Sequence, residues 1–319
     1  MIFVDSGSSA WEGFGEVRGR ETKVRDRGAD EAGGIQAGKD CARDEPRVAV
    51  VIASREDSPL SAQCAKNAGV PCVVVVGNDP ARQRNEGAAG VEAEVLWFVD
   101  DDTEFSPETV RCGLEWFRDP AVVAVGGPCP PNPNRRLAGE QAAVYAAMSS
   151  WLAYGPSRAR YIPAGRPRAG DESLLIGSNL MVRALTFRAV GGFPEGLFPN
   201  EENLLMDRLG RIGTLMYDPR FAAYREPPST LAEYFGKVRK YGGGRWRQFG
   251  RDRTLRNLLK VAMGIGSLLL AVVYPVTAGR LGGAAARAIH GTHFAYVAGI
   301  LKAMGSGPGN PRGELRARD

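Results

Sequence analysis

Short apolar runs alternate with polar, helix-forming segments from residue 47 onward. The runs at 48–53, 72–76 and 95–99 are rich in β-branched residues and predict buried strands. The segments 60–68 and 81–90 between them predict helices. Strands and helices that alternate at this spacing are typical of a doubly wound, mostly parallel sheet flanked by helices. We therefore expect an α/β fold.

The pattern continues with a predicted helix over 107–117, a strand over 122–125 and a long helical stretch over 137–154. A long strand or strand pair is expected over 174–183, two short strands over 214–217 and 221–224, and a helix over 230–241. The loops at 130–136 and 155–172 are rich in Gly, Pro and Arg. They are candidate walls of an acceptor site or simple connectors.

The two ends of the chain differ from this domain. Residues 1–45 lack apolar periodicity and are expected to be disordered, as is the tail over 305–319. One domain is expected over 46–250, followed by apolar helices over 257–304. Val261–Gly279 is nineteen residues without charge, just long enough to cross a bilayer. A buried helix or a helix lying in the membrane plane is the alternative.

The charge distribution points to a membrane surface. The net charge is only +5, but eight basic residues and one acid lie between Arg239 and Lys260, directly before the apolar run. Such a block could bind nucleic acid, but its position favours an anionic membrane surface or a bilayer, and no nucleic acid is expected. The positive-inside rule places that side in the cytoplasm.

Cysteine and histidine chemistry is not indicated. The five cysteines are scattered without CxxC spacing, which suggests neither a zinc site nor a disulfide framework. The two histidines, His290 and His293, are close to the C-terminus. Carboxylates must therefore carry acid–base and metal chemistry.

The strand at 95–99 ends in three adjacent acids, Asp100, Asp101 and Asp102. Carboxylates this close raise one another's pKa unless a cation or solvent relieves them. Asp100 and Asp102 project on the same side of an extended segment and could share a divalent metal ion. In open α/β sheets, ligands bind at this end of the strands. The alternative is a solvated acidic turn before the helix that begins near Ser106.

Several ordered motifs between residues 47 and 247 resemble inverting family 2 glycosyltransferases with the GT-A fold, of the membrane-associated bacterial type. They are the helix start Ala81–Gly87, the DxD stretch Phe98–Asp102, and a block comprising Gly177-Ser178-Asn179, Arg183, Gly191-Gly192-Phe193, Glu201-Glu202, Leu205 and Arg208. Lys240–Trp246 resembles the YGxGR variant of polysaccharide-assembling members.

The resemblance implies transfer of a sugar from a nucleotide-sugar to a hydroxyl of a lipid-linked or cell-envelope polysaccharide acceptor. It implies Mg²⁺ or Mn²⁺ on Asp102 and Asp100, and Glu202 as the base, with Glu201 as second candidate. The alternative for both glutamates is stabilisation of a helix N-terminus. Donor contacts are expected from Arg84, Asp100, Asp101, Asp79 and Ala53. Acceptor or diphosphate contacts are expected from Gly177, Asn179, Arg245 and Trp246.

The sequence also departs from the family pattern. The segment after the second strand shrinks to Asn78-Asp79, and Tyr224-Arg225-Glu226 lacks a histidine found in some relatives, although Glu226 could ligate a metal. Gly242 replaces the glutamine of the QxxRW motif, which argues against a processive synthase. Two alternatives are an inactive membrane-associated sugar-nucleotide-binding or scaffold protein, and a nucleotidyltransferase. The latter lacks its Gly-rich loop at 53–57.

Overall fold

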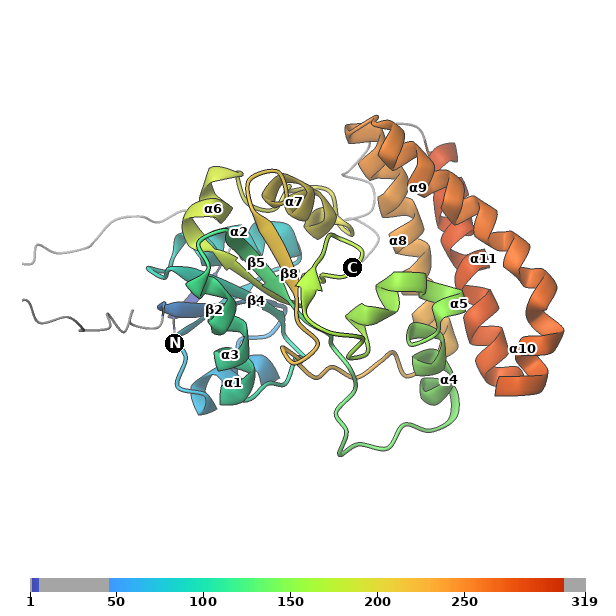
Figure 1. The fold of residues 1–319 in the computed structure, drawn as a ribbon, viewed down its shortest axis with the longest axis horizontal. Coiled ribbons are helices and arrows are strands. Elements are labelled where there is room, and N and C mark those ends of the chain that lie inside the picture. Colours follow the sequence, from blue (N-terminus) through green and yellow to red (C-terminus); the bar gives the residue numbers. More distant parts are fainter. Residues whose placement is uncertain (1, 6–45, 307–319) are drawn as a thin grey trace, which may run out of the picture. The chain divides into compact units, whose positions relative to one another are not determined.

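The computed structural model describes residues 2–5 and 46–306, which contain an eight-stranded sheet (Figure 1). The strand order is β1-β3-β2-β4-β7-β5-β8-β6. The strands are β1 (Ile2–Asp5), β2 (Val48–Ser54), β3 (Cys72–Val76), β4 (Val95–Asp100), β5 (Val122–Gly126), β6 (Arg168–Ala169), β7 (Asn179–Arg183) and β8 (Thr214–Tyr217).

The sheet is mixed, with a parallel half that matches the prediction. Strands β1, β3, β2 and β4 are parallel neighbours, and β5 is parallel to β8. Strand β7 lies antiparallel between β4 and β5, and β6 is antiparallel to β8. The predicted α/β class is confirmed. The strand expected over 221–224 is not formed, because Tyr224 makes only an isolated bridge with Glu104.

The N-terminal expectation needs one correction. Residues Ile2–Asp5 form strand β1, which pairs with β3 in register from Ile2 opposite Val73 to Asp5 opposite Val76. The expected disorder of 1–45 is therefore wrong for these four residues, since an apolar segment can complete the edge of a sheet. The remainder of 1–45, and 307–319 of the tail, lie outside the described residues.

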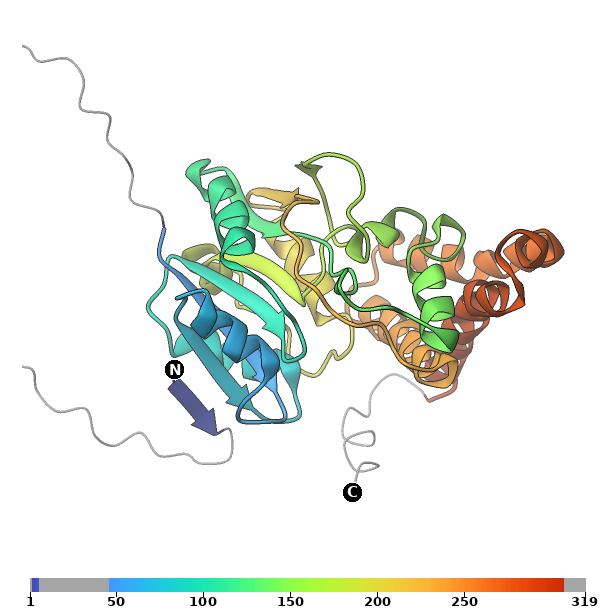
Figure 2. The same ribbon diagram turned by 90° about the horizontal axis from the view of Figure 1, so that it is seen from below.

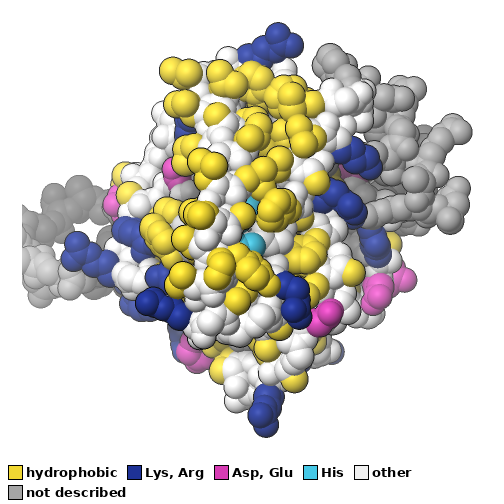
Figure 3. All heavy atoms as spheres, turned by 90° about the vertical axis from the view of Figure 1, so that its right-hand side faces the viewer, with side chains coloured by type: hydrophobic (Ala, Val, Ile, Leu, Met, Phe, Trp, Pro, Cys, Tyr) yellow, Lys and Arg dark blue, Asp and Glu magenta, His cyan; other side chains and the backbone are white. Residues whose placement is uncertain are grey.

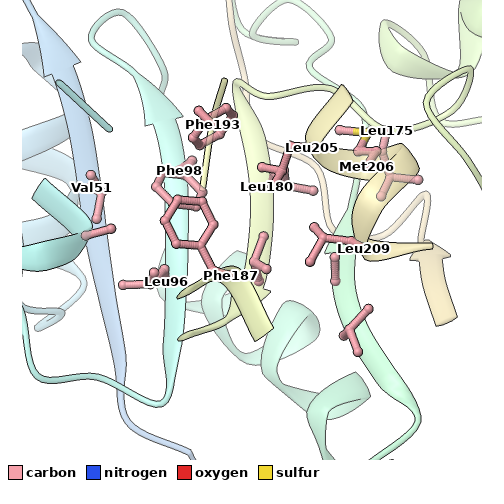
Figure 4. Close-up of a cluster of buried hydrophobic side chains, with 14 of the residues drawn as sticks. Val51, Leu96, Phe98, Leu175, Leu180, Phe187, Phe193, Leu205, Met206 and Leu209 are labelled. Atoms are coloured by element: carbon pink, nitrogen blue, oxygen red, sulfur yellow. The ribbon is translucent and has the colours of Figure 1, made fainter. Parts of the chain in front are cut away.

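Helices cover both faces of the sheet. The core on one face includes Phe98 and side chains from α2 (Pro80–Ala89), α6 (Ala184–Ala189) and α7 (Glu201–Leu209). Figure 4 shows Phe98, Phe187 and Phe193 gathered in this core. The core on the other face includes Trp97 and side chains from α1 (Leu60–Asn67) and α3 (Pro107–Leu114). Because β4 is buried on both faces, its sequence is continuously apolar.

A helical layer follows the sheet in sequence. It comprises α8 (Leu231–Arg251), α9 (Leu255–Gly266), the 3₁₀ segment η3 (Ser267–Val273), α10 (Tyr274–Leu281) and α11 (Gly283–Gly305). Helix α11 lies against α8, α9 and α10 (Figures 1 and 2). The helices α4 (Gly139–Met148) and α5 (Trp151–Tyr154) also contact α11, and the short η1 (Glu115–Arg118) and η2 (Gly155–Arg160) complete the fold.

Helix α8 is longer than the predicted helix over 230–241. It continues through Gly242, Gly243 and Gly244, although glycine disfavours a helix interior. A Cβ atom on Gly242 would lie 2.0 Å from the carbonyl oxygen of Tyr296 in α11, and one on Gly299 would lie 1.9 Å from that of Arg239. Close approach of two helix backbones therefore requires these glycines.

The outer surface of this layer is apolar. Figure 3 shows hydrophobic side chains along it, with Lys and Arg at its borders. The exposed side chains of the stretch from α9 to α10 are Leu255, Leu258, Leu259, Met263, Ile265, Leu269, Val272, Val273, Val276 and Leu281. We call this set the apolar face. Its inner side is polar, since Ser267 and Thr277 lie 3.0 and 3.2 Å from ring nitrogens of His293 and His290 in α11.

Ion pairs tie α9 to the sheet domain. Arg256 contacts Asp207 of α7 at 2.7 Å and Glu172 at 2.8 Å, and Lys260 also pairs with Glu172. Both acids are buried or nearly so, with side chains that are 9 and 5 % exposed. The helical layer is therefore fixed to the helix that begins with Glu201.

Candidate active site

The three consecutive acids lie at the carboxyl end of β4. Asp100 is the last residue of the strand, and Asp101 and Asp102 form the turn that follows. Asp100 and Asp102 both contact the guanidinium of Arg225, the latter at 2.7 Å from Oδ1 to Nε. The two carboxylates therefore face a common point. A turn brings them there, not the extended backbone that the sequence suggested.

Arg84 joins these acids to the second predicted pair. Helix α2 begins at Pro80, where the side chain of Asp79 accepts hydrogen bonds from the amides of Ala81 and Arg82. One turn later, Arg84 donates from Nη2 to Asp100 at 2.8 Å and from Nη1 to Glu201 at 2.9 Å. Its side chain is only 7 % exposed. The acids of β4 and of α7 therefore meet across one buried guanidinium.

Helix α7 delivers the second acid pair. Asn200 precedes it with a φ of 87°, a left-handed conformation that asparagine tolerates better than most residues. Glu201 is buried, and its Oε2 has no hydrogen-bond partner within the described chain. Burial and then the neighbouring Glu202 raise the pKa of Glu201 to about 8, although Arg84 acts in the opposite direction. Glu201 therefore holds its proton far more readily than an ordinary glutamate.

Glu202 is the more accessible of the two glutamates. It is half-buried, and a Cβ atom on Gly177 would lie 3.3 Å from its Cβ and 4.0 Å from Nη1 of Arg84. Gly177 thus lies directly beside Glu202 and Arg84. A larger side chain at 177 would press against both.

Arg225 is the site residue that sequence reasoning missed. Its stretch forms no regular element, and the family pattern marks a histidine in this stretch and not an arginine. The backbone is nevertheless fixed on both sides, because Tyr224 and Glu104 exchange two hydrogen bonds and the amide of Arg225 donates to Pro130 at 2.8 Å. Burial would lower the pKa of Arg225, but Asp100 and Asp102 raise it. It is therefore a permanent cation facing the acids.

The two arginines also set the charge of Asp100. Burial alone would raise the pKa of this carboxyl, but Arg225 and Arg84 bring it below its usual value. Asp101 differs, because burial and its neighbours Asp102 and Asp100 raise its pKa. Its side chain accepts a hydrogen bond from Ser54, at the end of β2, at 3.4 Å. Asp101 is therefore directed toward β2 and does not share the contacts of Asp100 and Asp102 with Arg225.

Two other expected donor residues lie in the same half of the sheet. Ala53 of β2 is in register with Asp100 of β4, which places it at the same edge. Asp79 caps helix α2, so its carboxylate already has a structural use. Tyr161 lies near the site as well: burial raises its pKa, Glu202 raises it further and Arg225 lowers it. No sequence motif singled out Tyr161.

Asn179 does not face the acceptor side, which corrects that expectation. It is fully buried in β7, where its side chain accepts from Nε1 of Trp97 at 3.0 Å and donates to the carbonyl of Phe221 at 2.7 Å. Its amide therefore fastens β7 to neighbouring segments. The GSN motif cannot distinguish this use from ligand binding.

Arg245 and Trp246 are not brought into the acid cluster. Arg245 donates to Gln248 one turn along α8 at 2.9 Å, and the ring of Trp246 lies 5.6 Å from that of Phe249. The neighbouring Gly244 does approach the site, since a Cβ there would lie 2.5 Å from the carbonyl oxygen of Pro199, two residues before Glu201. Helix α8 thus supports the start of α7.

Comparison with known proteins decides the family. Residues 43–176 match the family model "Glycosyl transferase family 2", and this range includes Arg84 and the three consecutive acids at the end of β4. This part of the chain is a family 2 glycosyltransferase domain. The α7 acids lie beyond the matched range, and in the fold they join the β4 acids through Arg84.

A solved structure agrees on the fold of this glycosyltransferase. The mannosyltransferase PcManGT from Pyrobaculum calidifontis, in complex with GDP-Man and Mn²⁺, superposes with a TM-score of 0.53 at 13 % identity. The match covers 82 % of this chain and 88 % of PcManGT. The GT-A fold is thereby confirmed. No curated protein matches the sequence significantly.

One carboxylate of the site is placed where it could bind a divalent metal ion. The side chain of Asp102 is 54 % exposed, so it can offer an oxygen ligand toward the solvent side, whereas Arg84 and Arg225 engage both oxygens of Asp100. Glu226 is turned toward Asn132 and Arg135 instead. Within residues 2–5 and 46–306, no cluster of three or more metal-ligating side chains occurs. Mg²⁺ and Mn²⁺ sites built from one or two carboxylates and substrate phosphates match this arrangement.

A hollow lies beside Tyr224, the residue before Arg225. Its volume is about 480 Å³, and Tyr224 contributes to its wall. Most of the remaining lining comes from the proline-rich loop and α4: Pro130, Pro131, Asn132, Pro133, Arg135, Leu137, Tyr145 and Pro163. The loop predicted as a candidate acceptor wall thus borders a real concavity.

Proposed function

We propose that this glycosyltransferase moves a sugar from a nucleotide-sugar donor to a hydroxyl of a lipid-linked or polysaccharide acceptor, with inversion and with help from a divalent metal. The observation that carries the proposal is the meeting of the β4 and α7 acids across Arg84. A donor held at one acid group is then within reach of a base on the other.

The charge balance supports a donor bound together with a cation. Asp100, Asp101, Asp102 and Glu202 provide four carboxyl groups against the two guanidinium groups of Arg84 and Arg225, and Glu201, with its raised pKa, is left out of this balance. A diphosphate entering this cluster needs additional positive charge. Asp102 would hold Mg²⁺ or Mn²⁺, and the bound metal would supply charge to the departing diphosphate. PcManGT, of the same fold, was solved with GDP-Man and Mn²⁺.

Glu202 is the proposed base. Its carboxylate takes the proton of the acceptor hydroxyl while that oxygen attacks the anomeric carbon and the bond to the diphosphate breaks on the opposite face. Glu201 is unsuited, because it is buried against Arg84 and its pKa of about 8 keeps it protonated over most of the neutral range. The accessible neighbour is therefore favoured over the buried one.

The acceptor is proposed to approach from the membrane side of the protein. By length and composition, Leu255–Leu281 could cross a membrane, and only 11 % of its most apolar window is buried. We favour an in-plane position at the cytoplasmic face. Helix α11 is packed between this segment and α8, which carries exposed charges such as Arg239 and Lys240. A bilayer can then touch the apolar face from one side only.

The test is turnover with a panel of UDP-, GDP- and dTDP-sugars in the presence of membrane extract as acceptor source. Release of the nucleoside diphosphate should require Mg²⁺ or Mn²⁺ and should fall at least about 100-fold in Asp102→Asn. Asp119→Asn, at an exposed turn before β5, should retain turnover. Equal activity in both variants would contradict the donor site.

A further inference from the structure

Arg225 occupies the place between the two carboxylates that the proposed metal would need. Its Nε lies 2.7 Å from Asp102, and its Nη1 contacts Asp100. Both contacts join full charges, so they are among the stronger hydrogen bonds in proteins. A divalent cation that reaches Asp102 must therefore displace or share a bonded guanidinium.

The two arginines of the site differ in their freedom to move. Arg84 is 7 % exposed, is held by acids at both ends and lies within helix α2. Arg225 is 30 % exposed and follows an irregular stretch in which only the backbone is fixed. A partly exposed guanidinium on a long side chain can change partners without disturbing the core. Arg225 can thus exchange its ligands, whereas Arg84 is a permanent structural bridge.

The chemistry of the guanidinium indicates its second partner. Its planar fork matches the geometry of phosphate as well as carboxylate. A donor diphosphate placed near Asp102 comes within reach of the same side chain. The carboxylates of the site would otherwise repel that diphosphate, so a guanidinium that moves from Asp102 to a phosphate oxygen reduces this repulsion.

We propose that Arg225 is an exchangeable internal cation: it bridges Asp100 and Asp102 in the empty protein and transfers to the donor diphosphate, which frees Asp102 for the metal. This inference rests on the proposed function. It implies that metal and nucleotide bind synergistically. The metal alone must compete with Arg225, but the metal with a diphosphate meets a free carboxylate.

The test measures Mn²⁺ binding directly, by the loss of the free Mn²⁺ signal in electron paramagnetic resonance. Wild type should bind Mn²⁺ weakly alone and on the order of tenfold or more tightly with GDP or UDP, within the usual range of coupling between sites. Arg225→Gln should bind Mn²⁺ alone on the order of tenfold more tightly than wild type and lose most of the synergy. When a chelator removes the metal, Arg225→Gln should also bind GDP and UDP more weakly than wild type does.

Two further variants distinguish a specific role of Arg225 in Mn²⁺ binding from a general effect of removing a positive charge. Arg135→Gln removes an equal charge from the nearby pair Glu104 and Glu226 and should leave Mn²⁺ binding unchanged. Arg225→Lys keeps the charge without the fork and should retain weak metal binding but lose nucleotide affinity. Circular dichroism checks that each variant is folded.

The inference is overturned if Arg225→Gln binds Mn²⁺ alone no better than wild type, or if Arg135→Gln has the same effect. Failure of every nucleotide to bind wild type would contradict the proposed donor. The comparison with Mn²⁺ alone would still decide the role of Arg225.

Discussion

The acid site buries charged side chains, whereas the apolar face exposes hydrophobic ones. Each arrangement is the opposite of what is usual in a folded protein. In the acid site, charged groups are buried: the side chains of Arg84 and Glu201 are 7 and 3 % exposed. On the apolar face, Leu269 and Val272 are 80 and 81 % exposed. Buried charges survive only when they are paired, and large exposed apolar patches usually mark a binding surface.

The difference shows how each region depends on a partner. In the acid site, a chain of ion pairs runs from Asp102 through Arg225 and Asp100 to Arg84, which also donates a hydrogen bond to Glu201. A ligand that binds in the acid site must therefore displace existing ion pairs. Among residues 2–5 and 46–306, nothing covers the outer side of the apolar face, so a membrane would bind there without displacing any contact of these residues. The following substitutions test the two regions against each other.

The largest effect is expected from Glu202→Gln. Loss of a general base should lower kcat by about 100- to 10,000-fold, while binding of the nucleotide is retained. Steady-state turnover and nucleotide titration measure the two quantities. Glu108→Gln, at an exposed position of α3, is the matched control and should be active. Near-normal turnover in Glu202→Gln would assign the proton transfer elsewhere.

Arg84→Met should strongly destabilise the fold. It leaves Glu201 and Asp100 buried without a shared partner, which should cost about 3–5 kcal/mol in the free energy of unfolding. Urea denaturation followed by circular dichroism measures the change. Arg82→Met, two residues earlier on the same helix, breaks only an exposed pair with Glu86 and should alter stability little. Similar losses in both variants would show that burial of the network is unimportant.

Leu269→Glu and Val272→Glu should weaken membrane binding. Each removes an apolar side chain from the proposed contact, which should lower partition into anionic vesicles roughly tenfold or more. Flotation of full-length protein with vesicles containing phosphatidylserine measures partition. Leu185→Glu is an equally exposed control on α6 of the sheet domain, at 81 %. If Leu185→Glu weakens flotation as much, the apolar face is not the docking surface.

Glu201→Gln should flatten the pH dependence of stability. The pKa of Glu201 rises from 4.5 to about 8 on folding, so the folded protein holds a proton that the unfolded chain releases. Stability should therefore fall as pH rises between about 4.5 and 8, by up to about 1.4 kcal/mol per pH unit. Urea unfolding of wild type and Glu201→Gln across this range isolates the contribution. Parallel curves would contradict the raised pKa.

The sequence predicted the site through residues whose neighbours fix their position. Asp100 ends a continuously apolar strand, so local pattern alone placed it at the edge of the sheet, whereas Arg84 was expected at the site only through the family resemblance. The pairing of Arg84 with Glu201 spans 117 residues, and no local pattern encodes it. The family motifs indicated that these residues belong together, but only the fold gave the contact.

The features that the sequence did not predict correctly share one cause, which is tertiary packing. Helix α8 continues through Gly242 because α11 packs against it, and the side chain of Asn179 accepts a hydrogen bond from Trp97 within the sheet. Arg225 stands on an irregular stretch whose course depends on Glu104 and Pro130. In each case the decisive partner is far away in sequence, where neither propensity nor periodicity can detect it.

The ion pairs of Arg256 have a mechanical consequence. This side chain pairs with Asp207 and thereby joins the surface helix to the helix that starts with the two glutamates. If α9 rests on a lipid layer as proposed, this link would set the height of Glu202 above it. The enzyme would then select acceptor hydroxyl groups by their distance from the lipid headgroups as well as by their chemistry.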